Sequence, residues 1–201
     1  MQDGTMKTVG FVRMKDGTRA EYELLRELEN QHAQGTAERV LRELRLQGEE
    51  TLPGYRITRL EHALQCATRA VRAGADTDWI VGALLHDIGD SLAPHNHDRF
   101  AAEILCPYLR AQVLWTVQHH GTFQMVYYAH HYGWNRYERD QYRDSPYFDS
   151  ACAFCERWDQ ESFDPDYPSE PLAVFEPLVR TVFARRPYAP EVLRAGVVEG
   201  P

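Results

Sequence analysis

The stretch Trp79-Ile80-Val81-Gly82-Ala83-Leu84-Leu85-His86-Asp87-Ile88-Gly89-Asp90 decides how this chain is expected to fold. It is long and apolar enough for a buried helix, and it ends in a His-Asp doublet followed by a glycine. An apolar helix needs no polar residue for its packing, so two adjacent ligand-type side chains indicate a metal site where the helix ends. Alone, the doublet is a weak signal, because both residues are common at exposed helix ends.

Further ligand-type residues lie beside other apolar stretches, and their presence strengthens the prediction of a metal site. Four imidazoles and two carboxylates suffice for two metal ions that share one bridging carboxylate, and such mixed ligation suits Fe, Mn or Zn. The candidate ligands are His62, His86, Asp87, His97, His120 and Asp159. One of the neighbours His119 and His120 is expected to bind metal, and we favour His120.

Composition bounds the class of protein. The chain has 201 residues, of which 43% are hydrophobic and 26% charged, as in soluble globular proteins with a single core. A net charge of −8 argues against nucleic acid or an anionic membrane as the main partner, because both require a basic face. The start of the chain does not resemble a signal peptide, and no run approaches the roughly 18 apolar residues of a membrane span. We expect a cytoplasmic protein with reduced cysteines.

Three regions are expected along the chain. Residues 1–54 form an N-terminal extension with two helices and a lid-like loop, residues 55–185 form a helical domain, and residues 186–201 form a tail. The loop from Glu49 to Tyr55 is rich in helix breakers and immediately precedes a ligand helix, so it is predicted to close over the site.

Capping signals place the ligand helices. Thr58 followed by Glu61 predicts a capping box at the start of the first one. Asp76 or Thr77 is expected to cap the next helix, which carries the doublet at its far end. The apolar segment that leads into the paired histidines is expected to stop at Gly121, because glycine favours helix ends. The aromatic run that follows, residues 123–137, is expected to serve packing rather than to cage a quaternary amine.

Taken together, these stretches resemble the HD-domain superfamily of helical metalloproteins, over roughly residues 55 to 185. Within it, the chain looks most like the HD-domain mixed-valent diiron oxygenases, which include myo-inositol oxygenase and enzymes that cleave 1-hydroxyalkylphosphonates. The resemblance is carried by Thr58-Arg59-Leu60-Glu61-His62-Ala63-Leu64-Gln65, Gly82-Ala83-Leu84-Leu85-His86-Asp87-Ile88-Gly89, His97 with Ala101 and Leu105, and Pro146-Tyr147-Phe148 with Arg157-Trp158-Asp159.

The resemblance implies an all-α, single HD-domain bundle in which the six candidate ligands hold two iron ions, with Asp87 as the bridge. It implies a mixed-valent Fe(II)/Fe(III) pair that uses O2 to cleave a C–P or C–C bond in a small hydroxylated substrate. A 1-hydroxyalkylphosphonate, with or without a quaternary amine, is such a substrate. Two positions depart from the phosphonate-cleaving relatives, which place a glutamate at Tyr55 and a lysine at Gln124. The expected substrate-binding residues are Tyr55, Thr58, Arg59, Gln124 and Arg157.

Two alternatives stay open. A metal-dependent phosphohydrolase acting on a nucleotide or other phosphoester uses the same fold, and Arg56, Arg59 and Arg157 are compatible with it. The simplest HD phosphohydrolases need only His, His-Asp and Asp, whereas this chain adds His97 and His120, which favours the oxygenase. The second alternative is a non-catalytic domain with a structural or sensing metal. In each case we expect a monomer or homodimer, and for the enzymes a small-molecule partner.

Overall fold

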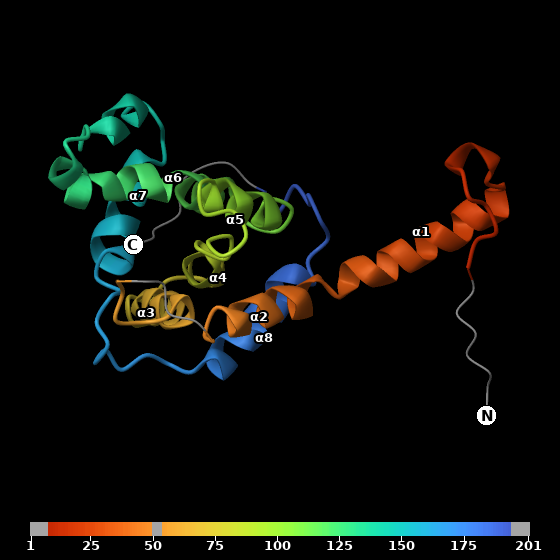
Figure 1. Ribbon diagram of the computed structural model, residues 1–201, viewed down its shortest axis with the longest axis horizontal. Coiled ribbons are helices and arrows are strands. Elements are labelled where there is room, and N and C mark those ends of the chain that lie inside the picture. Colours follow the sequence, from red (N-terminus) through yellow and green to blue (C-terminus); the bar gives the residue numbers. More distant parts are fainter. Residues whose placement is uncertain (1–7, 50–53, 194–201) are drawn as a thin grey trace.

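The computed structural model describes residues 8–49 and 54–193, and in these residues it contains helices and no strand (Figure 1). The expected all-α fold is confirmed. None of the described helices is both long and apolar enough to cross a membrane. The α-helices are α1 (Arg19–Gln34), α2 (Thr36–Leu46), α3 (Arg59–Arg72), α4 (Thr77–Leu85), α5 (His97–Leu105), α6 (Ala111–Tyr128), α7 (Phe148–Phe154) and α8 (Leu172–Phe183). The shorter turns are η1 (Met14–Asp16), η2 (Ala129–Tyr132), η3 (Glu138–Tyr142) and the π-helical η4 (Cys155–Asp159).

Helix α4 lies at the centre of the bundle, and every residue from Asp78 to Leu85 is buried. It packs against α3, α6 and α8, which is why a helix this apolar shows no polar face. Gly82 sits where α4 meets α6: a Cβ added there would lie 2.4 Å from Cγ1 of Val113. The glycine therefore sets the close approach of the two helices, and this approach brings the end of α4 beside the middle of α6.

Two helical glycines in contrasting surroundings give a test of this packing. Gly82→Ala is expected to lower the free energy of unfolding by about 1–3 kcal/mol, because the added methyl group overpacks the contact with α6. Gly121→Ala is the matched control, since the nearest atom to its added Cβ, outside its own helix backbone, is 3.8 Å away. It should raise stability by up to about 1 kcal/mol through helix propensity. Urea denaturation measures both, and equal stabilities would contradict the close packing.

Helix α1 projects from the bundle as an arm (Figure 1), and none of its residues is buried. Helix α2 differs, because Val40, Leu41 and Leu44 belong to the same core as α4 and α8. Helix α2, which was expected in the N-terminal extension, thus shares a core with the following helices, and the boundary at residue 54 stays a prediction. Residues 50–53 of the predicted lid and residues 194–201 of the predicted tail lie outside the described residues.

The predicted helix starts are confirmed. The Thr58 side chain accepts a hydrogen bond from the backbone N–H of Glu61, whose carboxylate accepts one from the backbone of Thr58. Asp76 caps α4 by accepting from the backbone N–H of Trp79. All four cysteines are free thiols, as expected.

The predicted end of α6 at Gly121 is wrong, because the helix continues to Tyr128. The cause is Phe123, which is fully buried and packs edge to face on Trp115 and against Phe148. Burying a phenylalanine contributes about 1.5–3 kcal/mol, which exceeds the roughly 1 kcal/mol that a glycine costs inside a helix.

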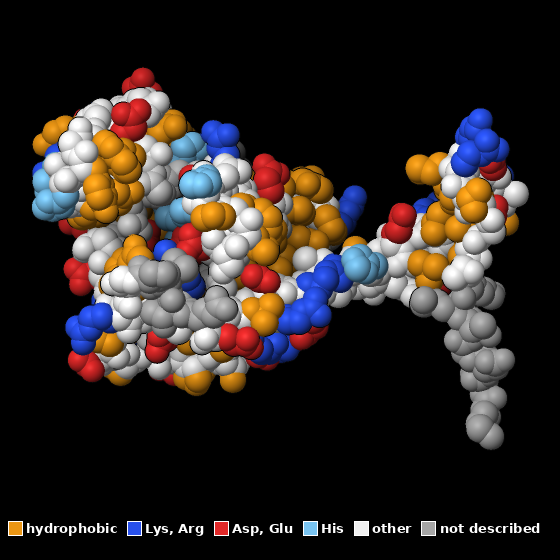
Figure 2. Space-filling view, in the orientation of Figure 1, with side chains coloured by type: hydrophobic (Ala, Val, Ile, Leu, Met, Phe, Trp, Pro, Cys, Tyr) orange, Lys and Arg blue, Asp and Glu red, His pale blue; other side chains and the backbone are white. Residues whose placement is uncertain are grey.

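The expectation that the aromatic run serves packing holds only for its first part. Tyr132, Trp134 and Tyr137, which follow α6, are each more than half exposed. Figure 2 shows hydrophobic and histidine side chains gathered on this lobe, at the left of the molecule. The rings pack on one another instead of the core, as in the pair Tyr132 and Trp134, whose centroids are 4.9 Å apart.

Candidate metal centre

Five segments of the bundle converge at one point and bring the six expected ligands together. These segments are α3, the turn that follows α4, the first turn of α5, the middle of α6 and the π-helical turn η4. All six side chains are buried except that of His97, which is half-buried. The residues concerned are His62, His86, Asp87, His97, His120 and Asp159.

The histidine rings are fixed in one tautomer by backbone carbonyls. His62 Nδ1 lies 2.8 Å from the carbonyl oxygen of Ser162, His86 Nδ1 lies 2.8 Å from that of Ala83, and the same atom of His120 lies 2.7 Å from a carbonyl on α6. A carbonyl can only accept, so each Nδ1 carries the hydrogen and each neutral ring offers a lone pair at Nε2. Such carbonyl contacts commonly orient metal-binding histidines.

The Nε2 lone pairs of His62 and His86 point toward each other, and no hydrogen-bond donor of a described residue lies between them. The Nε2 atoms of His62 and His86 are 3.1 Å apart, and Asp159 Oδ1 lies 3.3 Å from the first and 3.4 Å from the second. Both carboxylate oxygens of Asp159 are completely buried, and neither accepts a hydrogen bond of normal geometry from any described residue. Acceptors that crowd together in a dry interior require a cation, either bound protons or a metal ion.

The carboxylate of Asp87 faces two pairs of imidazoles at once. Its Oδ2 lies 3.5 Å from Nε2 of both His62 and His86. Its Oδ1 lies 3.3 Å from Nε2 of His97 and 3.1 Å from Nε2 of His120. Ligand atoms at such separations fit metal–ligand bonds of about 2.1 Å, because tetrahedral or octahedral geometry then spaces neighbouring ligands by roughly 3.0–3.4 Å.

Two triads within this cluster have all their ligand atoms within 4.8 Å of one another. They are His62, His86 and Asp159, and His86, Asp87 and His120. The donor set of imidazole nitrogens and carboxylate oxygens therefore fits a transition-metal ion.

A π-helical turn carries the ligand that comes last in the chain. The backbone N–H of Gln160 bonds to the carbonyl of Cys155 five residues earlier, which widens the helix at η4. Asp159 lies at the end of this turn, next to the buried Trp158. No local pattern in the sequence predicts this widened turn.

The charges of the cluster shift its pKa values in opposite directions. Burial lowers the pKa of His62, His86 and His120, but the carboxylates of Asp87 and Asp159 outweigh this and hold each pKa above its usual value. Burial raises the pKa of both carboxyl groups, yet the surrounding imidazoles, His86 foremost, leave each well below its usual value. Metal ions compete with these same protons.

A pH dependence of the metal-free protein follows from these directions. Raised histidine pKa values stabilise the fold below pH about 6.5, and this contribution is lost as the pH rises through the folded-state values. Lowered carboxyl pKa values stabilise the fold above pH about 3.9, and that contribution is lost as the pH falls. The metal-free protein should therefore melt at the highest temperature between these limits. Thermal melts from pH 4 to 8.5 test this; the decline above pH 6.5 should shrink when metal replaces the protons, and an unchanged decline would contradict it.

Only three of the five expected substrate-binding residues line the cavity beside the cluster, which has a volume of about 150 Å³. These are Tyr55, Arg59 and Gln124. The Thr58 hydroxyl caps α3, and Arg157 is exposed and is not among the lining residues. His119 also faces elsewhere: it stacks on Trp115 with a centroid distance of 4.3 Å, whereas its neighbour His120 meets Asp87.

Four supporting residues were not among the expected site residues. Asp90 lines the cavity and belongs to the stretch from Trp79 to Asp90, so its position four residues after His86 could have marked it. Tyr128 also lines the cavity, and it belongs to the aromatic run for which packing was expected. Phe163 lines the cavity without any local pattern that marks it. Gln47, at the end of α2, donates from its side-chain amide to the carbonyl of Asp87 at 3.1 Å and holds the doublet turn from behind.

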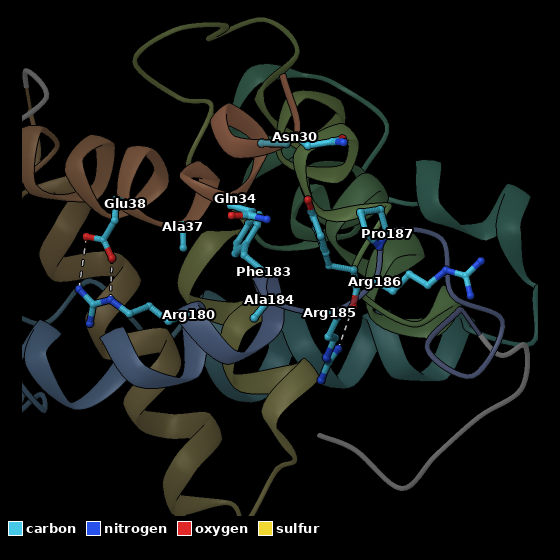
Figure 3. Close-up of a pocket in the computed structure, with 12 residues that line it drawn as sticks. Asn30, Gln34, Ala37, Glu38, Arg180, Phe183, Ala184, Arg185, Arg186 and Pro187 are labelled. Carbon is cyan, nitrogen blue, oxygen red and sulfur yellow. Dashed lines mark hydrogen bonds and ion pairs between the residues drawn. The ribbon is translucent and has the colours of Figure 1, made fainter. Parts of the chain in front are cut away.

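A larger cavity lies away from this cluster. It has a volume of about 750 Å³ and sits between the junction of α1 with α2 and the end of α8 (Figure 3). Glu38 and Arg180 pair at its edge, and Arg185 donates to the carbonyl of Tyr108. No metal-ligand triad is formed by its lining residues, which are described throughout. Size alone therefore does not identify the functional site, and the chemistry points to the smaller cavity.

Comparison with known proteins agrees with this geometry. A protein of Leisingera caerulea named 1-hydroxy-2-(trimethylamino)ethylphosphonate dioxygenase (glycine-betaine-forming) is 34% identical over 84 residues, which cover 36% of this chain and 43% of that protein. The chain thus matches less than half the length of this relative. The family model of the HD domain matches residues 59–157, a segment that carries five of the six clustered ligands and ends two residues before Asp159. Residues 59–157 of this chain thus belong to the HD-domain family.

Proposed function

We propose that this protein is a diiron oxygenase that uses O2 to cleave a C–P or C–C bond in a small hydroxylated molecule. The observation that carries the proposal is the carboxylate of Asp87, each of whose oxygens faces a different pair of histidines. A carboxylate that chelates one ion turns both oxygens toward the same ligand set, whereas a carboxylate that bridges two ions turns each oxygen toward a separate set. The name of the Leisingera relative, a dioxygenase acting on a hydroxylated phosphonate, supports the oxidative choice.

Each metal position has its own ligands. His62, His86 and Asp159 would hold one ion and His97 and His120 the other, with Asp87 shared. Two iron ions, in a mixed Fe(II)/Fe(III) state, would supply the capacity to activate O2 that amino-acid side chains lack. The half-buried His97 borders the cavity, so the second position is the one open to small molecules.

The chain itself supplies a small cavity for the substrate, bordered on one side by stacked rings. Tyr55 stacks on Phe163 with a centroid distance of 5.7 Å, and Phe163 stacks on His62 at 4.5 Å. This ring stack shields the ligands from water on one side, which protects reactive species from side reactions. A volume of about 150 Å³ suits a molecule of a few carbon atoms.

A 1-hydroxyalkylphosphonate is the substrate class that we propose. Its oxidation balances without an external reductant: R–CH(OH)–PO3H2 and O2 give R–COOH and phosphoric acid, so both oxygen atoms enter the products. The aromatic residues of the cavity would suit a quaternary amine on the R group through cation–π attraction. Nucleic acid and membrane lipid are not expected partners.

A phosphohydrolase is the second candidate, because Arg59 faces the cavity and guanidinium groups bind phosphate well. Two points favour the oxygenase. The cavity is small for a nucleotide, and His97 and His120 supply ligands on the open side of Asp87.

Metal analysis combined with spectroscopy tests the proposal. Protein purified without added metal is expected to contain two irons per chain and, after partial oxidation, a mixed-valent electron paramagnetic resonance signal. This signal should change on adding 1-hydroxy-2-(trimethylamino)ethylphosphonate or hydroxymethylphosphonate, and O2 should be consumed as phosphate is released. Phosphatase turnover with manganese or zinc, together with no O2 uptake by the iron form, would establish the hydrolase instead.

A further inference from the structure

We propose that Arg59 binds the oxyanion of the substrate, phosphonate or carboxylate, by exchanging its present partner Asp90 for that group. The inference rests on the proposed function in one respect, namely that a small anionic molecule enters this cavity. It gives Arg59, one of the expected substrate-binding residues, a specific role in recognising the anion, and it adds a carboxylate that pairs with Arg59 until substrate arrives.

Arg59 lies between the candidate metal ligands and the open side of the cavity. Its Nε is 2.5 Å from Oδ2 of Asp90, and its Nη1 is 3.8 Å from Oδ2 of Asp87. The face of Tyr55 covers the guanidinium, whose central carbon is 5.0 Å from the ring centroid. Both partners of the ion pair are largely buried, with side chains 16% and 11% exposed. The guanidinium is thus held at the cavity wall by a ring and a carboxylate.

In its contact with Asp90, Arg59 makes no hydrogen bond of normal geometry through its N–H donors. Although Nε and Oδ2 are close, they do not form a hydrogen bond of normal geometry, and both are buried atoms without another partner among the described residues. No other N–H of Arg59 donates a hydrogen bond to a described residue at normal geometry either. A guanidinium has five N–H donors in a planar fork that matches an oxyanion. Leaving the buried Nε without a hydrogen bond of normal geometry costs free energy that a bound anion would recover.

No other lining residue can take this role. Arg59 is the sole lysine or arginine among the described residues that line the cavity, and Gln124 at the same cavity is neutral. The remaining polar lining groups are the ligand histidines, the neutral hydroxyls of Tyr55 and Tyr128, and the carboxylates Asp87 and Asp90, which repel an anion. An anionic substrate that places its hydroxyl at the metals therefore has one cationic side chain within this cavity to meet.

Asp90 acts as the counter-ion that the substrate displaces. In the free protein it neutralises Arg59, which avoids an unpaired buried charge. It also approaches Nδ1 of His97, with its Oδ1 at 3.8 Å, so the released carboxylate has a second cationic or donor neighbour. Exchange of one carboxylate for a substrate oxyanion keeps Arg59 paired with an anion throughout, so the step does not leave a buried guanidinium unpaired.

Equilibrium binding of simple anions tests the inference without any turnover. The protein is loaded with zinc, which does not react with O2, and titrated by calorimetry with methylphosphonate and, separately, acetate. Arg59→Gln is expected to weaken methylphosphonate binding about 10-fold or more, since a charge-assisted hydrogen bond contributes about 1.5–3 kcal/mol. Arg59→Lys should recover part of this loss, because lysine keeps the charge but not the fork. The acetate titration shows which oxyanion the site prefers.

Two controls make the outcome decisive. Arg56→Gln removes the same charge at an exposed residue that does not line the cavity, and it should leave the Kd unchanged. Asp90→Asn should tighten binding several-fold if Asp90 competes with the anion, and weaken it if Asp90 only anchors Arg59. Equal Kd values in wild type and Arg59→Gln, or equal losses in Arg56→Gln and Arg59→Gln, would overturn the inference. Arg59-dependent binding without O2 consumption would instead retain this subsite and reject the oxygenase.

Discussion

Asp87→Ala is expected to lose both metal ions, and with them at least about 1,000-fold in turnover. The two oxygens of this carboxylate approach two separate imidazole pairs, so its removal takes one ligand from each position. A metal that loses a charged ligand from a set of three or four binds far more weakly, and here both sets are affected at once. Metal content per chain, measured after gel filtration, is the direct readout.

His120→Ala provides the comparison for this prediction. Its Nε2 meets only Oδ1 of Asp87, at 3.1 Å, so the variant should lose one metal and keep the other, which His62, His86 and Asp159 hold. His119→Ala should retain both, because that ring stacks on Trp115 away from the cluster. Full metal occupancy in Asp87→Ala, or equal losses in His119→Ala and His120→Ala, would contradict the bridging arrangement.

Five of the six clustered side chains could be predicted because each lies near the start or the end of a helix, whereas His120 was expected at a helix end and lies in the middle of α6. A histidine or aspartate beside an apolar stretch is costly to bury unless it binds a ligand or forms an ion pair. His62 and Asp159 could therefore be recognised as candidate ligands from the sequence alone. The cap at Thr58 was equally accessible, since a capping box is a local pattern of four residues. Such features depend on residues that are close together in the sequence, and they can therefore be predicted from it directly.

Features that depend on distant contacts were not accessible in the same way. The sequence predicts a helix end at Gly121 because glycine is flexible. It does not show that Phe123 is buried, and this burial keeps the helix intact beyond Gly121. Gln47 supports the doublet from 40 residues away, and Phe163 reaches the cavity from a segment with no regular structure. Arg157 is exposed and lies in the π-helical turn η4, whose widened geometry no local sequence pattern predicted. Tertiary packing decides each of these cases.

Removal of metal should produce the second large effect, on stability. A ligand present at 1,000 times its Kd stabilises the folded state by about 4 kcal/mol, which for a chain of this size raises Tm by roughly 8–16 °C. The effect should be strong here because the cluster gathers buried acceptors, including both oxygens of Asp159, that lack hydrogen bonds of normal geometry from described residues. A chelator should therefore lower Tm, and added Fe(II) under anaerobic conditions should restore it.

Asp159→Asn separates this linkage from general damage to the fold. The amide is nearly isosteric, but it ligates metal weakly and presents an NH2 group to His62 or His86, so the variant should lose about half or more of the Tm rise on adding metal. Its metal-free form should remain folded, because an imidazole Nε2 can accept from the new amide. Asp166→Asn is the matched control at an exposed carboxylate, and it should show the full rise. If Asp159→Asn kept the whole metal-dependent increase in Tm, Asp159 would not be a ligand, and its burial without hydrogen bonds would require another explanation.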